Sequence, residues 1–193
     1  MSKLYFYYGT MNCGKSMLLL AKAYNFQERS IPILLLKSRV DTRDGKDVIH
    51  SRSLGDKECI GFNKEENVFN IIENIVKNAD KKYQWILVDE AQFLTENQVD
   101  ELSDVVDKLD INVICYGLRT DFRTKLFPGS KRLFEVADTI EELKSTCSCG
   151  NKTIYNARID GDGNLVTKGK QVEVGGEDKY ISICRKCYKN KLI

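Results

Sequence analysis

One octapeptide close to the start of the chain constrains the fold more than any other feature. Residues 9–16 read GTMNCGKS and match the pattern G-x-x-x-x-G-K-[ST]. An apolar segment of strand length, residues 3–8, comes before it, and residues 16–29, rich in Leu and Ala, follow as a helical pattern. A loop between a strand and a helix is the context that this motif requires to bind a phosphate. The sequence therefore predicts a nucleotide-binding loop on an α/β fold.

The motif gives its residues separate tasks. Its glycines let successive backbone N–H groups point at a phosphate, and the helix N-terminus adds a favourable dipole. Lys15 is expected to reach the β- and γ-phosphates of a nucleotide, and Ser16 is expected to bind Mg²⁺. The loop residues predicted to bind ATP are Gly9, Thr10, Met11, Asn12, Cys13, Gly14, Lys15 and Ser16.

The following segments alternate between strand-like and helix-like patterns. Apolar runs at 31–37, 85–89 and 112–118 have the length of buried parallel strands. Apolar residues at helical spacing predict a helix over 68–79, and Thr95 is placed to cap another. Residues 39–63 are polar with little periodicity and are expected to be mostly loop. The alternation predicts a RecA-like P-loop fold, a parallel sheet flanked by helices with right-handed crossovers.

Two acidic residues end the strand predicted at 85–89. Asp89 would lie at the carboxyl end of that strand, beside the phosphate loop, where it can hold Mg²⁺ and so contribute to ATP binding. Glu90, one residue further, can accept a proton from an attacking nucleophile. That nucleophile is water in an ATPase and a substrate hydroxyl in a kinase, and the pattern alone leaves both open. Two acids that only solvate a strand end are the plainer alternative.

Four of the seven cysteines gather late in the chain. Cys147 and Cys149 form one pair, and Cys184 and Cys187 form the other. Four thiolates suit one tetrahedral structural Zn²⁺ per chain, and a reducing compartment favours such a site over disulfides. The alternative is four reduced thiols without metal. The composition also changes near Ser145, which predicts a nucleotide-binding domain over 1–144 and a zinc-binding domain over 145–193.

The segment between the cysteine pairs is rich in glycine. A metal site would hold its two ends together and make residues 151–183 a tethered loop, of the kind that can fold over a substrate. The stretch VEVGG at 172–176 could present bare backbone to a ligand. A simple β-hairpin is the alternative structure.

Charge and hydropathy narrow the functional classes. The net charge is +2, from 30 basic and 28 acidic residues, and no long basic tract occurs, which speaks against a protein that coats nucleic acid. The N-terminal residues lack the pattern of a secretory signal, and no apolar run approaches the roughly 20 residues of a membrane span. These features predict a soluble cytoplasmic protein that binds neither nucleic acid nor membranes.

Taken together, several motifs resemble one family across nearly all 193 residues. They are GTMNCGKS at 9–16, DTR at 41–43, DEAQF at 89–93, DFRTKLF at 121–127, TCSCG at 146–150, GGEDKY at 175–180 and CRKC at 184–187. The chain is similar to the type II thymidine kinases, which contain zinc and transfer the γ-phosphoryl group of ATP to the 5′-hydroxyl of thymidine or deoxyuridine. The resemblance implies a P-loop domain with a small zinc domain that carries a lasso loop, a homotetramer, and inhibition by thymidine triphosphate.

The resemblance also implies roles for particular residues. Glu90 would be the general base on the 5′-hydroxyl, and Arg43 would approach the phosphates of ATP. Backbone of the loop around 172–176 would read the edge of the base, which favours thymine over cytosine. The residues implied in binding the nucleoside are Phe93, Leu118, Phe122, Phe127, Asn156, Val172, Val174, Gly175 and Tyr180. For the aromatic residues, ordinary core packing is the alternative.

Three positions depart from the pattern of many relatives. Arg119 stands where many carry an acidic residue, Asn156 stands where many carry threonine, and the first cysteine pair is one residue closer than in several of them. Two other functions are weighed against the kinase: a P-loop ATPase that hydrolyses ATP, and a zinc-ribbon protein that binds nucleic acid and uses ATP as a switch.

Overall fold

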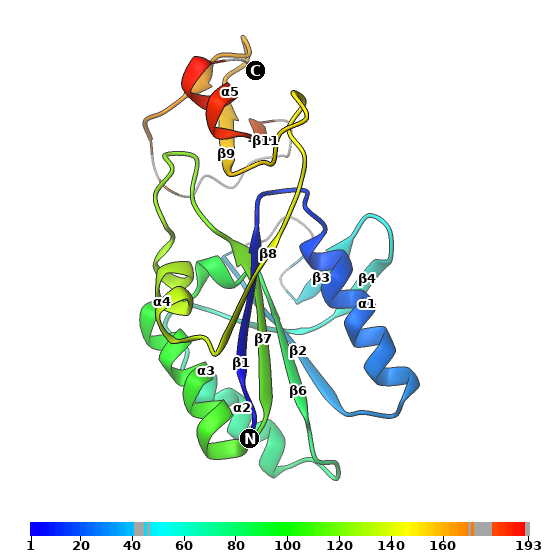
Figure 1. Cartoon of the computed structure of the whole chain (residues 1–193). Coiled ribbons are helices and arrows are strands. Elements are labelled where there is room, and N and C mark those ends of the chain that lie inside the picture. The colour runs from blue at the N-terminus through cyan, green and yellow to red at the C-terminus, as the bar shows by residue number, and fades with distance from the viewer. Residues whose placement is uncertain (41–44, 46, 170, 172–178, 192–193) are drawn as a thin grey trace.

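Six parallel strands form the centre of the molecule (Figure 1). A computed structural model describes residues 1–40, 45, 47–169, 171 and 179–191. The strand order is β5-β2-β6-β7-β1-β8. These strands are β1 Leu4–Gly9, β2 Ile33–Ser38, β5 Ile60–Phe62, β6 Trp85–Asp89, β7 Asn112–Leu118 and β8 Thr139–Leu143. Because all six run the same way, their carboxyl ends meet at one edge of the sheet, where ligands bind in folds of this kind.

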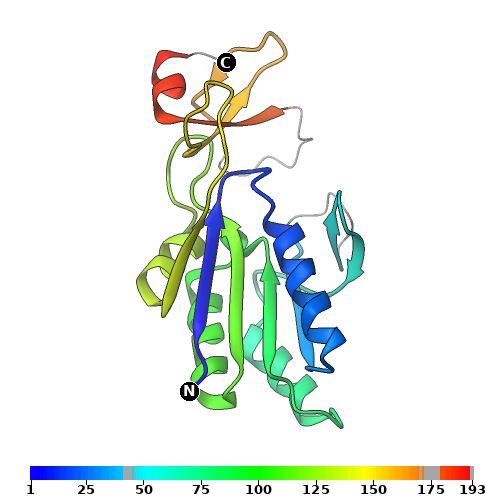
Figure 2. The same ribbon diagram turned by 45° about the vertical axis from the view of Figure 1, so that its right-hand side comes forward.

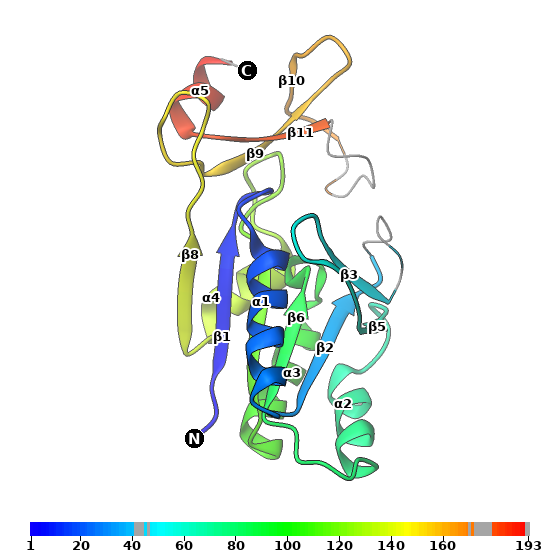
Figure 3. The same ribbon diagram turned by 90° about the vertical axis from the view of Figure 1, so that its right-hand side faces the viewer.

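Helices cover both faces of this sheet (Figure 3). The first, α1 (Lys15–Glu28), packs on one face, where Leu19 and Leu20 meet the buried side chains of Leu35 and Leu87. The opposite face carries α2 (Val68–Lys77), α3 (Glu96–Leu109) and α4 (Pro128–Val136). Successive strand residues point to alternate faces, so a central strand such as β6 must be apolar throughout. The apolar runs of the sequence therefore predict this two-sided core correctly.

Local signals set where the helices begin. Thr95 caps α3: its hydroxyl accepts a hydrogen bond from the Gln98 backbone N–H at 3.1 Å, and the Gln98 side chain accepts from the Thr95 N–H at 3.1 Å. Asn67 caps α2 in the same way through the Asn70 N–H. The helix predicted from Thr95 is confirmed, and the strands predicted at 85–89 and 112–118 have those bounds in the structure.

The interpretation of residues 39–63 as mostly loop is wrong. Three strands lie there: β3 (Val48–Ser51) and β4 (Gly55–Glu58), which form an antiparallel hairpin, and β5, which joins the main sheet beside β2. Ile49 of β3 packs into the core beside Leu35 and Leu87, but the other strand is mostly exposed, and His50 stands opposite Asp56. A short hairpin with so few apolar residues shows too little alternation to be recognised as two strands.

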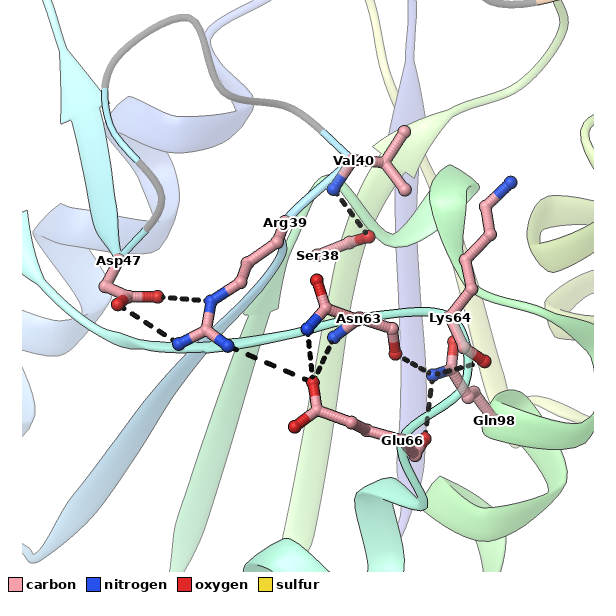
Figure 4. A network of polar contacts seen from close by, with 8 residues as sticks. All are labelled: Ser38, Arg39, Val40, Asp47, Asn63, Lys64, Glu66 and Gln98. Atoms are coloured by element: carbon pink, nitrogen blue, oxygen red, sulfur yellow. Dashed lines mark hydrogen bonds and ion pairs between the residues drawn. The ribbon is translucent and has the colours of Figure 1, made fainter.

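A network of polar contacts joins the end of β2 to the start of α3 (Figure 4). Gln98 is buried, and its Nε2 donates to the carbonyl oxygens of Asn63 at 2.8 Å and Glu66 at 3.0 Å. Arg39, which follows β2, holds Asp47 through two hydrogen bonds of 2.8 and 3.1 Å, and lies 3.9 Å from the Glu66 carboxylate. The connection from β5 to α2 is therefore fixed by buried and charge-assisted bonds.

A smaller module lies beyond the carboxyl edge of the main sheet (Figure 2). It contains β9 (Tyr155–Ile159), β10 (Leu165–Val166) and β11 (Tyr180–Ile183), an antiparallel sheet in the order β10-β9-β11, followed by α5 (Arg185–Asn190). We call residues 145–191 the C-terminal module. Its small core includes Ala157 and Ile183 beside three of the clustered cysteines. The domain boundary predicted at Ser145 falls just after β8 and stays a prediction.

Candidate active site

The phosphate loop follows β1 and depends on two glycines. A Cβ at Gly9 would lie 2.8 Å from the carbonyl oxygen of Leu143 and 2.4 Å from Cys13 Sγ, so only glycine lets β1 pass this close to β8. Gly14 has a φ of 86° directly before α1, a conformation that side chains strain. The first helical bond runs from Leu18 N–H to Gly14 O at 2.9 Å. Within the described part of the chain, no group accepts from the N–H groups of 13–17, which leaves them for a phosphate.

Lys15 lies across the loop. It is 9 % exposed, and its Nζ donates to the carbonyl oxygen of Thr10 at 2.6 Å and lies 3.7 Å from Cys13 Sγ. The ammonium group is therefore held over the concave side of the loop, where the phosphates of a nucleotide are expected. A buried ammonium with a carbonyl as its close partner is well placed to exchange that partner for an anion.

Ser16 and Asp89 meet where Mg²⁺ was predicted. Ser16 Oγ donates to Asp89 Oδ2 at 2.9 Å, and the Glu90 backbone N–H donates to Asp89 Oδ1 at 3.0 Å. Burial raises the pKa of Asp89, while the bonds from Ser16 and Glu90 and the charges of Lys15 and Lys37 lower it. A buried carboxylate beside a hydroxyl offers two oxygen ligands to a hard cation, so the residues present fit Mg²⁺.

Glu90 stands at the turn after β6 in a left-handed conformation with a φ of 53°. The Gln92 side chain fixes it: Gln92 Nε2 donates to Glu90 Oε2, and Gln92 Oε1 accepts from the Leu118 backbone N–H at 2.9 Å. A Cβ at Gly117 would lie 3.0 Å from the Gln92 backbone nitrogen, so glycine there allows this approach. Gln92 is not among the residues predicted from the sequence, although its place in DEAQF, two residues after Glu90, is a signal for such a role.

The predicted aromatic residues divide into two groups. The rings of Phe93 and Phe127 meet edge to face, with centroids 5.8 Å apart. Phe122 is buried and instead has the guanidinium groups of Arg158 and Arg123 at 5.5 and 5.9 Å from its ring centroid. Phe93 follows β6, Leu118 is the last residue of β7, and Phe122 and Phe127 follow β7.

Asn156 and Tyr180 belong to the C-terminal module, on β9 and β11. Asn156 is 3 % exposed; its Oδ1 accepts from the Met11 backbone N–H at 2.7 Å, and its Nδ2 donates to Thr120 O at 3.2 Å. The Met11 N–H is thus already engaged within the protein. The other residues predicted to bind substrate or phosphate, Arg43, Val172, Val174 and Gly175, lie outside the described residues.

The four clustered cysteines fit a zinc ion. All four Sγ atoms lie within 4.8 Å of one another, Cys149 and Cys184 at 3.6 Å, and none is in a disulfide. Zn–S bonds of about 2.3 Å in a tetrahedron require sulfurs roughly 3.8 Å apart. The short Cys147–Cys149 spacing is accommodated by a tight turn, in which Gly150 has a φ of 83° and donates to Cys147 O at 2.8 Å. The C-x-C spacing is therefore compatible with the cluster.

A parallel sheet, a loop of free N–H groups before α1 and a buried aspartate facing Ser16 define a P-loop nucleotide-binding protein. The profile of the family described as "Thymidine kinase" matches residues 2–188. The chain belongs to the thymidine kinase family.

Curated bacterial relatives agree with this family. A thymidine kinase of Haemophilus influenzae is 47 % identical over 191 residues, which are 99 % of this chain and 98 % of that protein. One of Pasteurella multocida is 48 % identical over 192 residues, covering 100 % of this chain and 99 % of its own. One of Rhizobium meliloti is 45 % identical over 192 residues, with 100 % and 98 % covered.

The solved structures that match this chain are less similar to it than these curated relatives are. The Pif1 helicase of Candida albicans has a TM-score of 0.43 and 16 % identity; the match covers 75 % of this chain and 36 % of the helicase. A Bacteroides Pif1 bound to single-stranded DNA has a TM-score of 0.41 and 12 % identity, with 73 % and 38 % covered. The chain thus spans little more than a third of either helicase, and no function is transferred from them. Among the described residues, no helix is long and apolar enough to span a membrane.

Proposed function

We propose that this protein transfers the γ-phosphoryl group of ATP to the 5′-hydroxyl of thymidine, and also of deoxyuridine. The observation that carries the proposal is the turn after β6, where Asp89 faces Ser16 and Glu90 is fixed beside it by Gln92. A carboxylate next to the metal position can take a proton from an acceptor placed in line with the γ-phosphate. The family of the chain supports thymidine as that acceptor.

The phosphate loop, Glu90 and Arg43 have separate roles in the proposed reaction. The open N–H groups of 13–17 bind the phosphates of ATP, and Lys15 exchanges Thr10 O for the β- and γ-phosphate oxygens. Glu90 holds the 5′-hydroxyl and accepts its proton as the new P–O bond forms and the bond to ADP breaks. Arg43, outside the described residues, adds positive charge near the phosphates.

Ser16 and Asp89 would hold the Mg²⁺ of the nucleotide. When bound, this ion neutralises charge on the β- and γ-phosphates. The four cysteines would hold a structural Zn²⁺. Four thiolates would leave this ion no open coordination position, so it would take no part in the reaction.

Recognition of the base follows from fixed backbone groups. Thymine presents a donor at N3 and an acceptor at O4, whereas cytosine presents an acceptor at N3 and a donor at N4. Backbone N–H and C=O groups of residues 172–176 cannot exchange roles, as a side-chain amide can. Cytosine would leave two polar groups unpaired, at about 1–3 kcal/mol each, so the discrimination can reach the order of 10⁴. Deoxyuridine lacks only a methyl group, which costs about 1 kcal/mol.

A coupled assay of ADP release over the deoxynucleosides tests the proposal. Thymidine and deoxyuridine are expected to give ADP, and deoxycytidine, deoxyadenosine and deoxyguanosine essentially none. Deoxycytidine with a kcat/KM within about tenfold of thymidine would contradict the account of the base site. ADP release without any acceptor would favour the ATPase, and salt-sensitive binding of DNA or RNA would favour the nucleic-acid-binding switch.

The family resemblance further supports assembly into a homotetramer and inhibition by thymidine triphosphate. A cytoplasmic location is proposed from the composition, and it is consistent with a metal-bound rather than disulfide-bonded set of cysteines. Size-exclusion chromatography with light scattering, and inhibition assays with the triphosphate, test the first two.

A further inference from the structure

The start of the phosphate loop is held by side chains of the C-terminal module. Ser182 Oγ donates to the carbonyl oxygen of Met11 at 2.6 Å, and the Met11 N–H donates to Asn156 Oδ1 at 2.7 Å. The hydroxyl of Thr153 lies 2.9 Å from that of Thr10. Both polar backbone groups of Met11 are therefore bound by a part of the chain that lies 145 to 171 residues later in sequence.

The geometry of the module makes this contact specific. Asn156 on β9 and Ser182 on β11 stand directly opposite each other in the antiparallel pair, so one cross-strand pair binds both the backbone N–H and the backbone C=O of Met11. Asn156 cannot turn its amide around, because Met11 N–H can only donate and Thr120 O, 3.2 Å from Asn156 Nδ2, can only accept. Asn156 is also 3 % exposed, so a lost bond would leave a buried polar group unpaired.

We propose that Ser182 and Asn156 are positioning residues of the nucleotide site, which fix Met11 and thereby hold the phosphate loop in its binding conformation. The affinity for ATP then depends on the C-terminal module as well as on the phosphate loop itself. The inference rests on the proposed nucleotide site and is independent of the identity of the acceptor.

The physical reason is preorganisation. Thr10 and Met11 lead from the end of β1 into the N–H groups of 13–17, and neither residue belongs to a helix or a strand. A loop already fixed in its bound shape loses little conformational entropy when the nucleotide arrives, whereas a loosened loop must be ordered by it. The Met11 N–H is excluded as a phosphate donor in this arrangement, because it serves the anchor instead.

Replacement of Ser182 is the most direct test, because its hydroxyl donates to Met11 in the loop and Ser182 is not among the residues proposed to bind the nucleoside. Ser182→Ala is expected to weaken binding of Mg·ADP, measured by isothermal titration calorimetry, by about three- to tenfold. The KM for ATP should rise in parallel, while the KM for thymidine stays within about twofold. Ser182→Thr keeps the hydroxyl on a β-branched residue that suits a strand, and should restore ADP binding.

Controls separate positioning from simple loss of structure. Asn164→Ala alters an exposed turn of the same small sheet, where the Asn164 side chain donates to Asp160, and should leave ADP binding unchanged. Zinc content and thermal unfolding are measured for every variant. If Ser182→Ala loses zinc or unfolds early, Thr153→Val, which removes the contact with Thr10, takes its place with the same expectation.

Two results would overturn the inference. One is wild-type affinity for Mg·ADP in a folded, zinc-loaded Ser182→Ala protein. The other is an equal rise of both KM values, which would indicate a general loosening of the site. Failure of thymidine as acceptor, with ADP binding weakened as expected, would refute the proposed reaction and leave the positioning role intact.

Discussion

Glu90 occupies an unusual backbone position. A positive φ is uncommon for a residue with a side chain, and it is maintained here although it costs on the order of 1 kcal/mol or more. The turn directs the Glu90 N–H onto Asp89, while Gln92 ties the Glu90 carboxylate to β7 through the Leu118 N–H. Asp89 therefore fixes the backbone of Glu90 and Gln92 fixes its carboxylate, as expected of a group that must meet a hydroxyl in a fixed direction.

Glu90→Gln tests the proposed role of this carboxylate. The substitution keeps the shape and the acceptor oxygen for Gln92 but removes the base, so kcat should fall by about 10²–10⁴-fold. Binding of Mg·ADP should stay near wild type. Glu96→Gln, an exposed glutamate in the first turn of α3, is the matched control and should turn over normally. Wild-type turnover in the Glu90 variant would exclude the general-base role.

For single residues, the sequence predicts which side chains belong to the site better than it predicts which groups those side chains contact. The motifs that contain Lys15, Ser16 and Asp89 predict that these residues lie close together, because in a P-loop fold the phosphate loop and the end of this strand are neighbours. The resemblance placed Asn156 beside the base, and the structure adds its bond to the Met11 N–H. No local pattern predicts that bond, because it joins residues 145 positions apart.

Among the elements, the junction of α2 and α3 depends on one buried side chain. Gln98 donates to two carbonyl oxygens through Nε2 and accepts from the Thr95 N–H through Oε1. Its amide therefore completes the cap of α3 and fixes the segment that leads into α2. A carboxylate at this position would face the same carbonyl oxygens with no hydrogen to donate.

Gln98→Glu is accordingly expected to lower the free energy of unfolding by at least about 2 kcal/mol near neutral pH. Urea denaturation followed by circular dichroism measures the effect. Gln84→Glu makes the same change at an exposed position and should shift the unfolding free energy by less than about 0.5 kcal/mol. Equal stabilities of the two variants would show that the Gln98 contacts contribute little.

The buried strands of the central sheet can be predicted from the sequence, whereas the peripheral strands and α4 cannot. The strands of the central sheet are apolar on both sides, and that requirement marks them in the sequence as continuous apolar runs. The β3–β4 hairpin contributes Ile49 to the core but is otherwise largely polar, and α4 and β8 carry weak apolar patterns. Their positions follow from tertiary contacts, which override local preference.

For the whole molecule, the cysteine cluster decides whether the C-terminal module holds its shape. The module has a core of few apolar residues, too small to be stable without a cross-link. Cys184→Ser is expected to lose zinc, measured by elemental analysis, and hydrogen exchange should then speed up first in residues 145–191. Cys59→Ser, outside the cluster, should keep about one zinc per chain. Absence of zinc from freshly reduced wild-type protein would contradict the assignment.

The strand order also has a consequence for synthesis on the ribosome. β1 is synthesised before both of its neighbours in the sheet, β7 and β8, whose partners for Leu4 and Tyr5 are Val113 and Thr139. Until β7 has been made, the strand that carries the phosphate loop has neither of its sheet neighbours to pair with. The phosphate loop is therefore translated well before the strands that order it, so β1 must stay unaggregated until β7 and β8 have emerged.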